Sequence, residues 1–342
     1  MAGKTTQKIQ IARESTAGTA ITSDFTVWRG MGGHLQDERE TTIVEEMIGV
    51  SAQTTRNYTP RFGATLDLAA TEATFEQFPH LLEMGIKTTT GIVDTGASAT
   101  GYIYTYATAN TSEDTIKTYT IESGDTTAQR VGEYTFCESF TLAWTATEAV
   151  KMSATLRSRQ SANLSGGFDT STTADAEAVL GGKMSFYEDD AKAFPATTQV
   201  TGTVLSGDIT VNTGRKPKYI SDDGQLYFNF VYVDPSEFKA EGSIVLEHDA
   251  AALALIADWE AGTSKTFRFQ WLGSALAVAG DTYTYKSLIF DCQATITGVD
   301  ALTDEEGNGV VTLNFESGYN PAVAISEHMQ FIVVNELTAL AG

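Results

Sequence analysis

The stretch GATLDLAATEATFEQFPHLLEMG, Gly63 to Gly85, has a counterpart later in the chain, GSIVLEHDAAALALIADWEAG, Gly242 to Gly262. Each stretch begins with a glycine, continues as a strand-like run, crosses a capping residue into an apolar stripe of helical spacing, and ends at a glycine. Side-chain identity between the two is low, so the repeat consists of order and pattern. The sequence therefore predicts that one strand–helix unit occurs twice.

Each unit predicts an amphipathic helix that lies on a sheet. In the second unit Asp249 caps the helix and Gly262 ends it in the left-handed conformation. Its apolar stripe is Ala252, Leu255, Ile256 and Trp259. In the first unit Thr71 is the expected cap and Gly85 the expected stop, and Pro79 predicts a kink or a late start. Its stripe is Phe75, Phe78 and Leu82.

Elsewhere the dominant pattern is an alternation of apolar and polar residues with period two, which is typical of half-buried strands. The runs Tyr134–Trp144 and Val150–Leu156 are predicted to pair as antiparallel strands. Asp223 and Gly224 predict a two-residue hairpin turn, because both residues tolerate positive φ. Further strand-like runs are Leu226–Tyr232, Phe267–Trp271, Leu288–Ile296 and Val311–Phe315. The fold class is mainly β.

The same patterns divide the chain into two modules, residues 1–160 and residues 182–342, joined by a small and polar linker at 161–181. The first module carries a segment near 88–115 that is rich in Thr, Gly, Ala and Ser, typical of an inserted loop or extended hairpin. Cys137 and Cys292 occur at matching places in the two halves. Because matching places in separate modules are far apart, we expect two buried thiols and no disulfide.

Composition limits the function. The 342 residues are 42% hydrophobic and 19% charged, with a formal net charge of −22. The apolar fraction suffices for packed cores, and the acidic excess disfavours binding to free nucleic acid or an anionic membrane. No run approaches the roughly 20 apolar residues that span a bilayer, and the N-terminus has no signal-peptide core, so folding in the cytoplasm is the default. The charge provides either plain solubility or an acidic functional surface.

No catalytic, cofactor or metal site is predicted. The four histidines are widely spaced and form no zinc-binding pair; they are His34, His80, His248 and His328. Phosphate-loop, dinucleotide and nucleophile-elbow motifs are absent from the sequence. Acidic clusters such as Asp304-Glu305-Glu306 could hydrolyse glycosides only if two carboxylates faced each other across a groove, and solvated loops explain such clusters more simply.

Two segments are predicted to contact other subunits. Gln36–Gly49 mixes strong charge with β-branched residues, as an extended arm that reaches a neighbour does. Thr210–Gly224 gathers three bases in an otherwise acidic chain, which either pair with acids of another subunit or belong to a solvated hairpin tip. The contact candidates are Glu38, Arg39, Glu40, Glu45, Glu46, Arg215, Lys216 and Lys218.

A series of segments carries a resemblance to a known family, and the segments keep their order along the chain. They are ESTAGTAITSDFTVWRG, QDERE…EEMIG, ATEATFEQFPHLLEMGI, KTYTIESGD, YTFCESFTLAWTATEAVKMSATLRSRQ, TGRKPKY and LEHDAAALALIADWEAGTSKTFRF. Through this series the chain resembles, over most of its length, the tail tube proteins of long-tailed bacteriophages. None of these segments is a catalytic signature.

This resemblance implies two tandem antiparallel β-sandwich modules, each flanked by one helix and joined edge to edge into a ring-forming barrel. Such rings stack into a hollow tube through which DNA leaves the capsid. The chain is then a structural virion protein of the tail, made in the host bacterial cytoplasm, and not an enzyme. Since members with one module form six-subunit rings, two modules predict trimeric rings with pseudo-sixfold symmetry; hexameric rings are the alternative.

The resemblance also implies the partners. Besides other copies of itself, these are the tape measure protein inside the tube, the tail terminator and distal tail proteins at its ends, and viral DNA that passes without specific binding; no membrane is involved. Gln36–Gly49 and Thr210–Gly224 are expected to reach from ring to ring. An acidic lumen would let DNA slide without sticking. The alternative function is a monomeric two-domain β-sandwich that binds glycans or mediates adhesion through an exposed aromatic groove.

Overall fold

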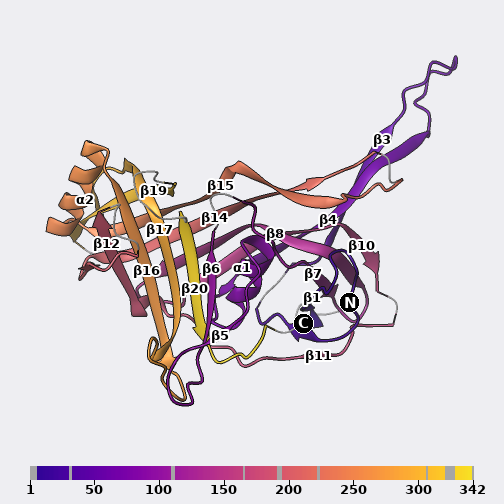
Figure 1. The fold of residues 1–342 in the computed structure, drawn as a ribbon. Coiled ribbons are helices and arrows are strands. Elements are labelled where there is room, and N and C mark those ends of the chain that lie inside the picture. Colours follow the sequence, from indigo (N-terminus) through magenta and orange to yellow (C-terminus); the bar gives the residue numbers. More distant parts are fainter. Residues whose placement is uncertain are drawn as a thin grey trace.

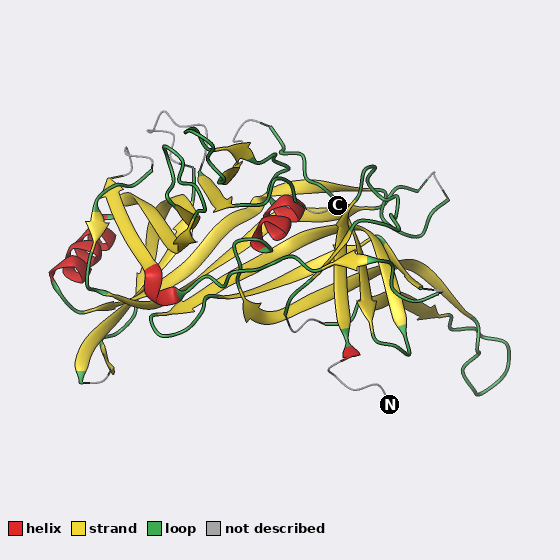
Figure 2. Cartoon of the chain, turned by 90° about the horizontal axis from the view of Figure 1, so that it is seen from below, coloured by secondary structure: helices red, strands yellow, loops and turns green. Residues whose placement is uncertain are grey.

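Strands make up most of the chain, as the alternating pattern predicts (Figures 1 and 2). The computed structural model describes residues 6–30, 33–108, 112–164, 166–190, 195–221, 224–305, 307–319 and 328–340. These ranges contain the α-helices α1 (Phe78–Gly85) and α2 (Ala250–Ala261) and a 3-10 helix at Gly181–Lys183. The strands are β1 (Lys8–Arg13), β2 (Phe25–Val27), β3 (Gln36–Ile43), β4 (Asn57–Glu72), β5 (Ile92–Val93), β6 (Tyr102–Ala107), β7 (Tyr119–Gly124), β8 (Gln129–Thr145), β9 (Lys151–Ser158), β10 (Gln160–Asn163), β11 (Ser171–Thr172), β12 (Met184–Asp190), β13 (Gln199–Val200), β14 (Val204–Lys218), β15 (Phe230–Glu247), β16 (Ser264–Ala275), β17 (Tyr285–Val299), β18 (Thr303–Glu305), β19 (Asn308–Ser317) and β20 (Met329–Asn335).

Eight strands form one continuous antiparallel sheet, in the spatial order β3–β4–β9–β8–β14–β15–β19–β17. The first four strands come from the first half of the chain and the last four from the second. The halves meet where β8 pairs with β14, from Thr145 opposite Ser206 to Ser139 opposite Asn212. We call this pairing the seam. It joins the two halves edge to edge.

Strand pairings of the first half recur in the second half in the same chain order. The ladder β1–β7–β8–β9–β4–β3 corresponds to β12–β16–β17–β19–β15–β14. A bulge at Glu138 in β8 has its counterpart at Thr297 in β17, which fixes the register. The same register aligns two backbone hydrogen bonds, Ala73 N–H to the Val150 carbonyl and His248 N–H to the Gly309 carbonyl. The repeat in the sequence is therefore part of a larger repeat of pairings.

Helix α2 forms as its sequence predicts. The Asp249 side chain accepts hydrogen bonds from the backbone N–H groups of Ala251 and Ala252. Gly262 ends the helix with a left-handed φ of 65°, which glycine adopts without strain. The apolar stripe is only half buried, because Trp259 remains 38% exposed.

Helix α1 starts late, at Phe78 with Pro79 in its first turn, as predicted, but Thr71 does not cap it. A bulge between Leu68 and Thr71 prolongs β4, so Thr71 pairs within the sheet. Thr74 instead accepts a 3.1 Å hydrogen bond from the Gln77 N–H through its hydroxyl. In the repeat register Thr74 corresponds to the capping aspartate of α2. The predicted cap was wrong because the bulge carries the strand past it.

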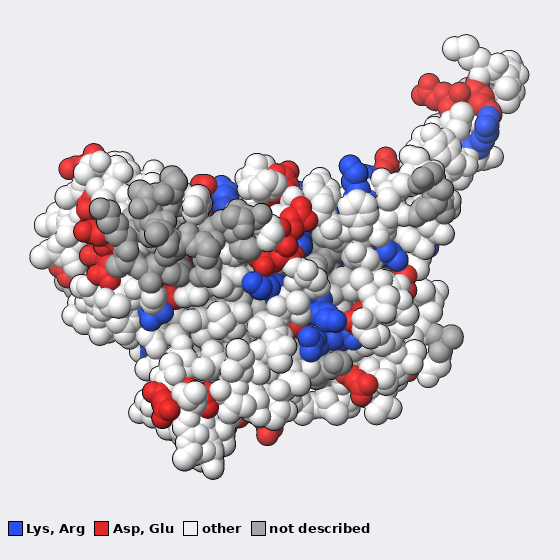
Figure 3. Space-filling view, in the orientation of Figure 1, with Lys and Arg blue, Asp and Glu red and all other residues white. Residues whose placement is uncertain are grey.

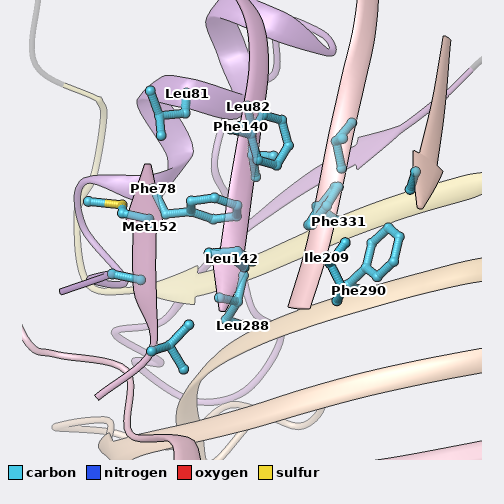
Figure 4. Packing of buried hydrophobic residues seen from close by; sticks show 14 of the residues in the cluster. Phe78, Leu81, Leu82, Phe140, Leu142, Met152, Ile209, Leu288, Phe290 and Phe331 are labelled. Carbon is cyan, nitrogen blue, oxygen red and sulfur yellow. The ribbon is translucent and has the colours of Figure 1, made fainter. Parts of the chain in front are cut away.

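Helix α1 lies inside a core that the two halves share (Figure 4). Helix α2 lies at the end of the molecule that is farthest from β3 (Figure 1). All eight residues of α1 are buried. Phe78 packs edge-on against Phe140 of the first half, with ring centroids 5.5 Å apart, and against Phe331 of the second half at 5.8 Å. Phe331 in turn stacks on Phe290 at 4.5 Å. Buried aromatic side chains from both halves are therefore in direct contact within one core.

Two connecting segments are more ordered than the sequence indicates. The inserted segment near 88–115 forms the hairpin β5–β6, and β6 pairs with β20 of the second half, with Tyr104 opposite Val333. The predicted linker pairs with the first half, since β10 lies beside β8 and β11 beside β2. Both segments therefore contribute strands.

The predicted two-residue turn at Asp223 and Gly224 was wrong, and Asp223 itself lies outside the described residues. Pairing of β14 with β15 ends where Lys218 faces Phe230, so the connection runs through residues 219–229. The Leu226–Tyr232 run is consequently a strand only from Phe230 onward. The two cysteines are free and buried, as predicted. They do not occupy matching positions, because the bulge register aligns Cys137 with Ile296.

Candidate functional site

Both segments predicted to contact other subunits border one groove, which has a volume of about 690 Å³. It lies at the base of a long hairpin made of β3, residues 44–56 and β4, which we call the arm and which projects from the chain (Figure 1). The far wall of the groove is β14 with Lys216 and Pro217, followed by Tyr219. The fold thus brings together segments that lie more than a hundred residues apart.

Ion pairs line the groove on the arm side. Arg157 of β9 reaches Glu138 at 2.7 Å and Glu38 at 3.0 Å. Burial alone would lower the pKa of Arg157, but the hydrogen bond and charge of Glu138 raise it above its usual value. Glu40 pairs with Arg61 at 2.8 Å. Arg39 similarly pairs with Asp37 at 2.6 Å and lies over the ring of Phe62. These pairs are partly exposed, so each contributes about 0–1 kcal/mol and their main effect is to orient the base of the arm.

The tip of the β14–β15 hairpin packs on the first half of the chain. Phe228 is fully buried, with its ring 5.3 Å from Tyr134 and 5.8 Å from Phe136. Arg159 donates hydrogen bonds to the carbonyl oxygens of Phe228 at 3.1 Å and Asn229 at 2.8 Å. Sequence reasoning misses this contact, because the alternation around Phe228 predicts a strand. The returning side of the tip is therefore docked through Phe228, whereas Tyr219, Ile220 and Leu226 remain exposed.

Arg215, a predicted subunit contact, lies inside the chain. Its guanidinium donates to the carbonyl oxygens of Gly85 and Ile86, both at 2.9 Å, and of Asp114 at 2.8 Å. Burial lowers its pKa to about 10, so it stays protonated near neutral pH. It satisfies the carbonyl groups at the end of α1, which the helix itself leaves free. It therefore joins the two halves of one chain.

The remaining candidates lie at the surface. Lys216 pairs with Glu237 at 2.7 Å across the hairpin, and Lys218 lies over the ring of Tyr232. Glu45 is exposed on the arm, and Glu46 pairs with Arg56 at 2.7 Å. Acidic and basic side chains consequently lie next to each other on the arm (Figure 3).

The outer part of the arm also presents apolar side chains to solvent. Met47 is fully exposed, Ile48 is 63% exposed and Val50 is 62% exposed. Apolar side chains grouped on the surface this far from a core are typical of an interaction surface. The sequence shows these residues among the charges of Gln36–Gly49, but only the structure shows that nothing in the described part of the chain covers them.

The eight-stranded sheet has one apolar and one polar face. Phe140 and Leu142 of β8 point toward the core that holds α1, so the alternate residues Thr141 and Ala143 point the other way. Rows of cross-strand partners extend this polar face across the seam. One row is Ser153, Thr141, Thr210, Glu241 and Glu316, and the next is Lys151, Ala143, Asp208, Ser243 and Asn314. Half of these ten side chains carry a hydroxyl or amide group, and three carry a carboxylate.

A buried polar cluster anchors α1 to β1 and β7. Glu83 accepts from Arg13 at 2.7 Å and from the Tyr119 hydroxyl at 2.7 Å. The same hydroxyl lies 3.0 Å from Nδ1 of His80. Burial, assisted by the charge of Arg13, lowers the pKa of His80 to about 3, so the ring is neutral near pH 7. The cluster fixes the helix in the core.

Two negative findings concern the described residues alone. None of their His, Cys, Asp and Glu side chains gather in a group of three or more that could hold a metal ion. No helix among them is long and apolar enough to cross a membrane.

Comparison with known proteins assigns this arrangement to a family. The family described as phage tail tube protein matches residues 5–317, nearly the whole chain. No curated protein matches the chain. Members of the family are structural components of the virion tail and not enzymes, consistent with a shared core, an edge-to-edge seam and projecting contact segments. The chain therefore belongs to the phage tail tube protein family.

Proposed function

We propose that three copies of the chain close a ring, and that stacked rings form the tube through which viral DNA leaves the capsid. Each copy contributes two sandwich modules, residues 1–160 and 182–342, so that the ring has pseudo-sixfold symmetry. The seam is the observation that carries this proposal. Two halves with the same order of strand pairings already lie side by side in one sheet within a single chain.

Ring closure follows from the ends of that sheet. An open sheet leaves unpaired N–H and C=O groups along its outer strands, which invite aggregation unless another strand covers them. The eight strands of each copy alternate in direction from β3 to β17, so end-to-end joining of copies preserves the antiparallel order and gives a closed barrel without edges. Rings of six copies, with twelve modules, are the alternative.

The polar face of the sheet would line the lumen, because the helices and the apolar core occupy the other face. That face carries the acids Asp67, Asp208, Glu241 and Glu316 with the bases Lys151, Arg157 and Lys239. Arg157 is held by Glu138 and Glu38. Asp208 bonds to the neutral Ser243 side chain, whereas Lys239 is held by Glu241 and Glu316 at 3.1 Å each. A wall with few free cations offers DNA phosphates little to bind, so the duplex slides. A cryo-EM map with a net basic lumen would contradict this.

The arm would connect one ring to the next. It projects beyond the sheet, carries both charge signs on its surface and ends in exposed apolar side chains that a neighbouring ring can cover. Glu38, Arg39, Glu40, Glu45 and Glu46 lie on it. Lys216 lies across the groove at its base, and Lys218 ends the same strand, β14. The tape measure protein would fill the lumen during assembly, and terminator and distal tail proteins would cap the two ends.

Negative-stain electron microscopy of the purified chain, combined with its solution mass, tests the proposal. We expect rings or tubes with a central hole and a ring mass of three chains. A ring mass of six chains would favour the wider alternative. If the particles lack a central hole at every concentration, even when tail-tip complexes are present, the proposal that the sheet ends join copies into a tube is refuted.

A further inference from the structure

The two ends of the eight-stranded sheet are incompletely paired within the described residues. β3 pairs along one edge only, with β4. β17 loses β16 after Thr295, so its last residues, Ile296–Val299, pair only with β19. In the first half the corresponding part of β8 does have a second partner, namely β14 across the seam. The position on β17 that corresponds to the seam is therefore open.

The seam supplies a register for whatever fills that position. In the seam Thr141 faces Thr210, with hydroxyl oxygens 2.9 Å apart. The bulges align Ser139 of β8 with Gly298 of β17. Two residues further along each strand, Thr141 of the first half therefore corresponds to Asp300 of the second. In the repeat, Thr65 of β4 corresponds to Glu241 of β15. Gln36 of β3 faces Thr65 and Thr210 of β14 faces Glu241, so Gln36 corresponds to Thr210. A strand bound to β17 as β14 is bound to β8 would thus bring Gln36 opposite Asp300.

Helix α2 gives an independent sign that this end of the chain is covered in the assembly. In the repeat register Leu253 and Trp259 of α2 correspond to Phe78 and Met84 of α1. Phe78 and Met84 are fully buried, whereas Leu253 is 52% and Trp259 is 38% exposed. Phe78 is buried partly by Phe331, a residue from the other side of the seam. In the described part of the chain no residue covers Leu253 and Trp259 in the same way.

Building on the ring proposed above, we infer that β3 of a second copy pairs antiparallel with the C-terminal end of β17, with Gln36 opposite Asp300, and that this copy also covers Leu253 and Trp259 of α2. The occupant is a second copy because β3 is the counterpart of β14, the strand that makes the internal seam. The bond between subunits is thus a repeat of the bond between the halves of one chain.

Disulfide cross-linking of purified tubes tests the register. Facing residues of an antiparallel pair have Cα atoms about 4.5–5.5 Å apart, which a disulfide can span. The variant Gln36→Cys/Asp300→Cys should form a disulfide between chains on mild oxidation. Thr141→Cys/Thr210→Cys is the matched control and should form the same bond within one chain. Cys137 and Cys292 are buried and contribute little background.

The possible outcomes test the proposed contact separately from ring formation. Covalent multimers from the Gln36→Cys/Asp300→Cys variant support the inference. The control is Gln36→Cys/Val299→Cys, in which the two side chains point to opposite faces of the sheet, and it should give at least tenfold less cross-linked product. Tubes that form normally but yield no preferred cross-link at this register overturn it and leave the proposed function standing. Failure of the wild-type chain to form any ring would refute the proposed function and this contact with it. The largest covalent species independently gives the number of chains per ring.

The α2 contact has its own readout. Trp28, Trp144 and Trp271 are buried, so Trp259 is the tryptophan whose surroundings should change most on assembly. We expect its fluorescence to shift to shorter wavelength when rings form, and the shift to vanish in Trp259→Phe. Leu253→Glu should reduce ring formation at least tenfold, while Ile92→Glu, an exposed apolar residue on β5, should not. Equal effects of both variants, or no fluorescence change in intact tubes, would contradict coverage of α2.

Discussion

Arg215 of the second half donates a hydrogen bond of 2.9 Å to the carbonyl oxygen of Gly85, at the end of a helix in the first half. The guanidinium also reaches two neighbouring carbonyl groups, so one buried side chain satisfies the end of α1 from across the seam. The side chain that completes the C-terminal end of α1 therefore comes from the other half of the chain.

Arg215→Met should lower the free energy of unfolding by about 2–4 kcal/mol, because three carbonyl groups, two of them in buried contacts, lose this partner. Lys216→Met is the matched control on the adjacent residue. Its ion pair with Glu237 is solvent-exposed, so we expect a loss below about 1 kcal/mol. Urea unfolding monitored by circular dichroism measures both. Equal losses would show that Arg215 does not hold the seam.

The two repeated glycines, Gly85 and Gly262, should respond differently to alanine. At Gly85 a Cβ atom would lie 2.8 Å from Cγ2 of Thr213, so Gly85→Ala should push the halves apart and cost about 1–3 kcal/mol. At Gly262 no atom lies within 4 Å, and only the left-handed φ of 65° opposes alanine, at about 1–2 kcal/mol. Hydrogen exchange distinguishes them: Gly85→Ala should expose amides of β14, and Gly262→Ala only those of α2.

Buried His80 should make the chain sensitive to acid. Its pKa is about 3 in the folded chain and near its usual 6.5 in the unfolded chain. Between these values the unfolded chain binds the extra proton, so stability falls as the pH drops from 6.5 toward 3. The contribution at pH 4 is on the order of 3 kcal/mol.

His80→Gln should remove this part of the pH dependence, whatever its effect on stability at pH 7. His248→Gln serves as the control, because His248 is exposed. Unfolding free energies at pH 7, 5.5 and 4 give the slope for each variant. An unchanged slope in His80→Gln would mean that other groups cause the acid sensitivity.

Polar substitutions on the arm should separate ring formation from stacking. Replacing Met47, Ile48 and Val50 with serine should leave the free energy of unfolding within about 0.5 kcal/mol, because these side chains are exposed. If the arm connects rings, tubes should shorten at least tenfold while single rings persist. Tubes of normal length would exclude an apolar role for the arm tip.

Local elements were predictable from the sequence because their causes are local. Asp249 and Gly262 set the ends of α2, Pro79 delays α1, and alternation alone pairs β8 with β9. The arm and hairpin were found from charge, and the fold then brought them to one groove. The family was identified from the ordered series of segments.

The remaining features depend on partners far along the chain. Helix α1 begins after Gln77 and not after Thr71, because a bulge that no residue type announces carries β4 past Thr71. Phe228 leaves its predicted strand because an aromatic pocket of the first half accepts it. Arg215 resembled a surface base in the sequence, since only the seam gives it three carbonyl acceptors. A pattern of neighbouring residues carries no information about contacts between segments so far apart in the sequence.

The burial of α1 has a consequence for synthesis on the ribosome. Its environment includes Arg215, Phe331 and the Asn335 side chain, which donates to the Phe75 carbonyl at 2.8 Å. At about 5–20 residues per second, roughly 12–50 s separate translation of the helix from translation of its last partner. During that interval an apolar helix must wait without its cover. The nascent first half is thus the stage at which this chain most needs a chaperone, and it becomes able to build a tube only once translation is nearly finished.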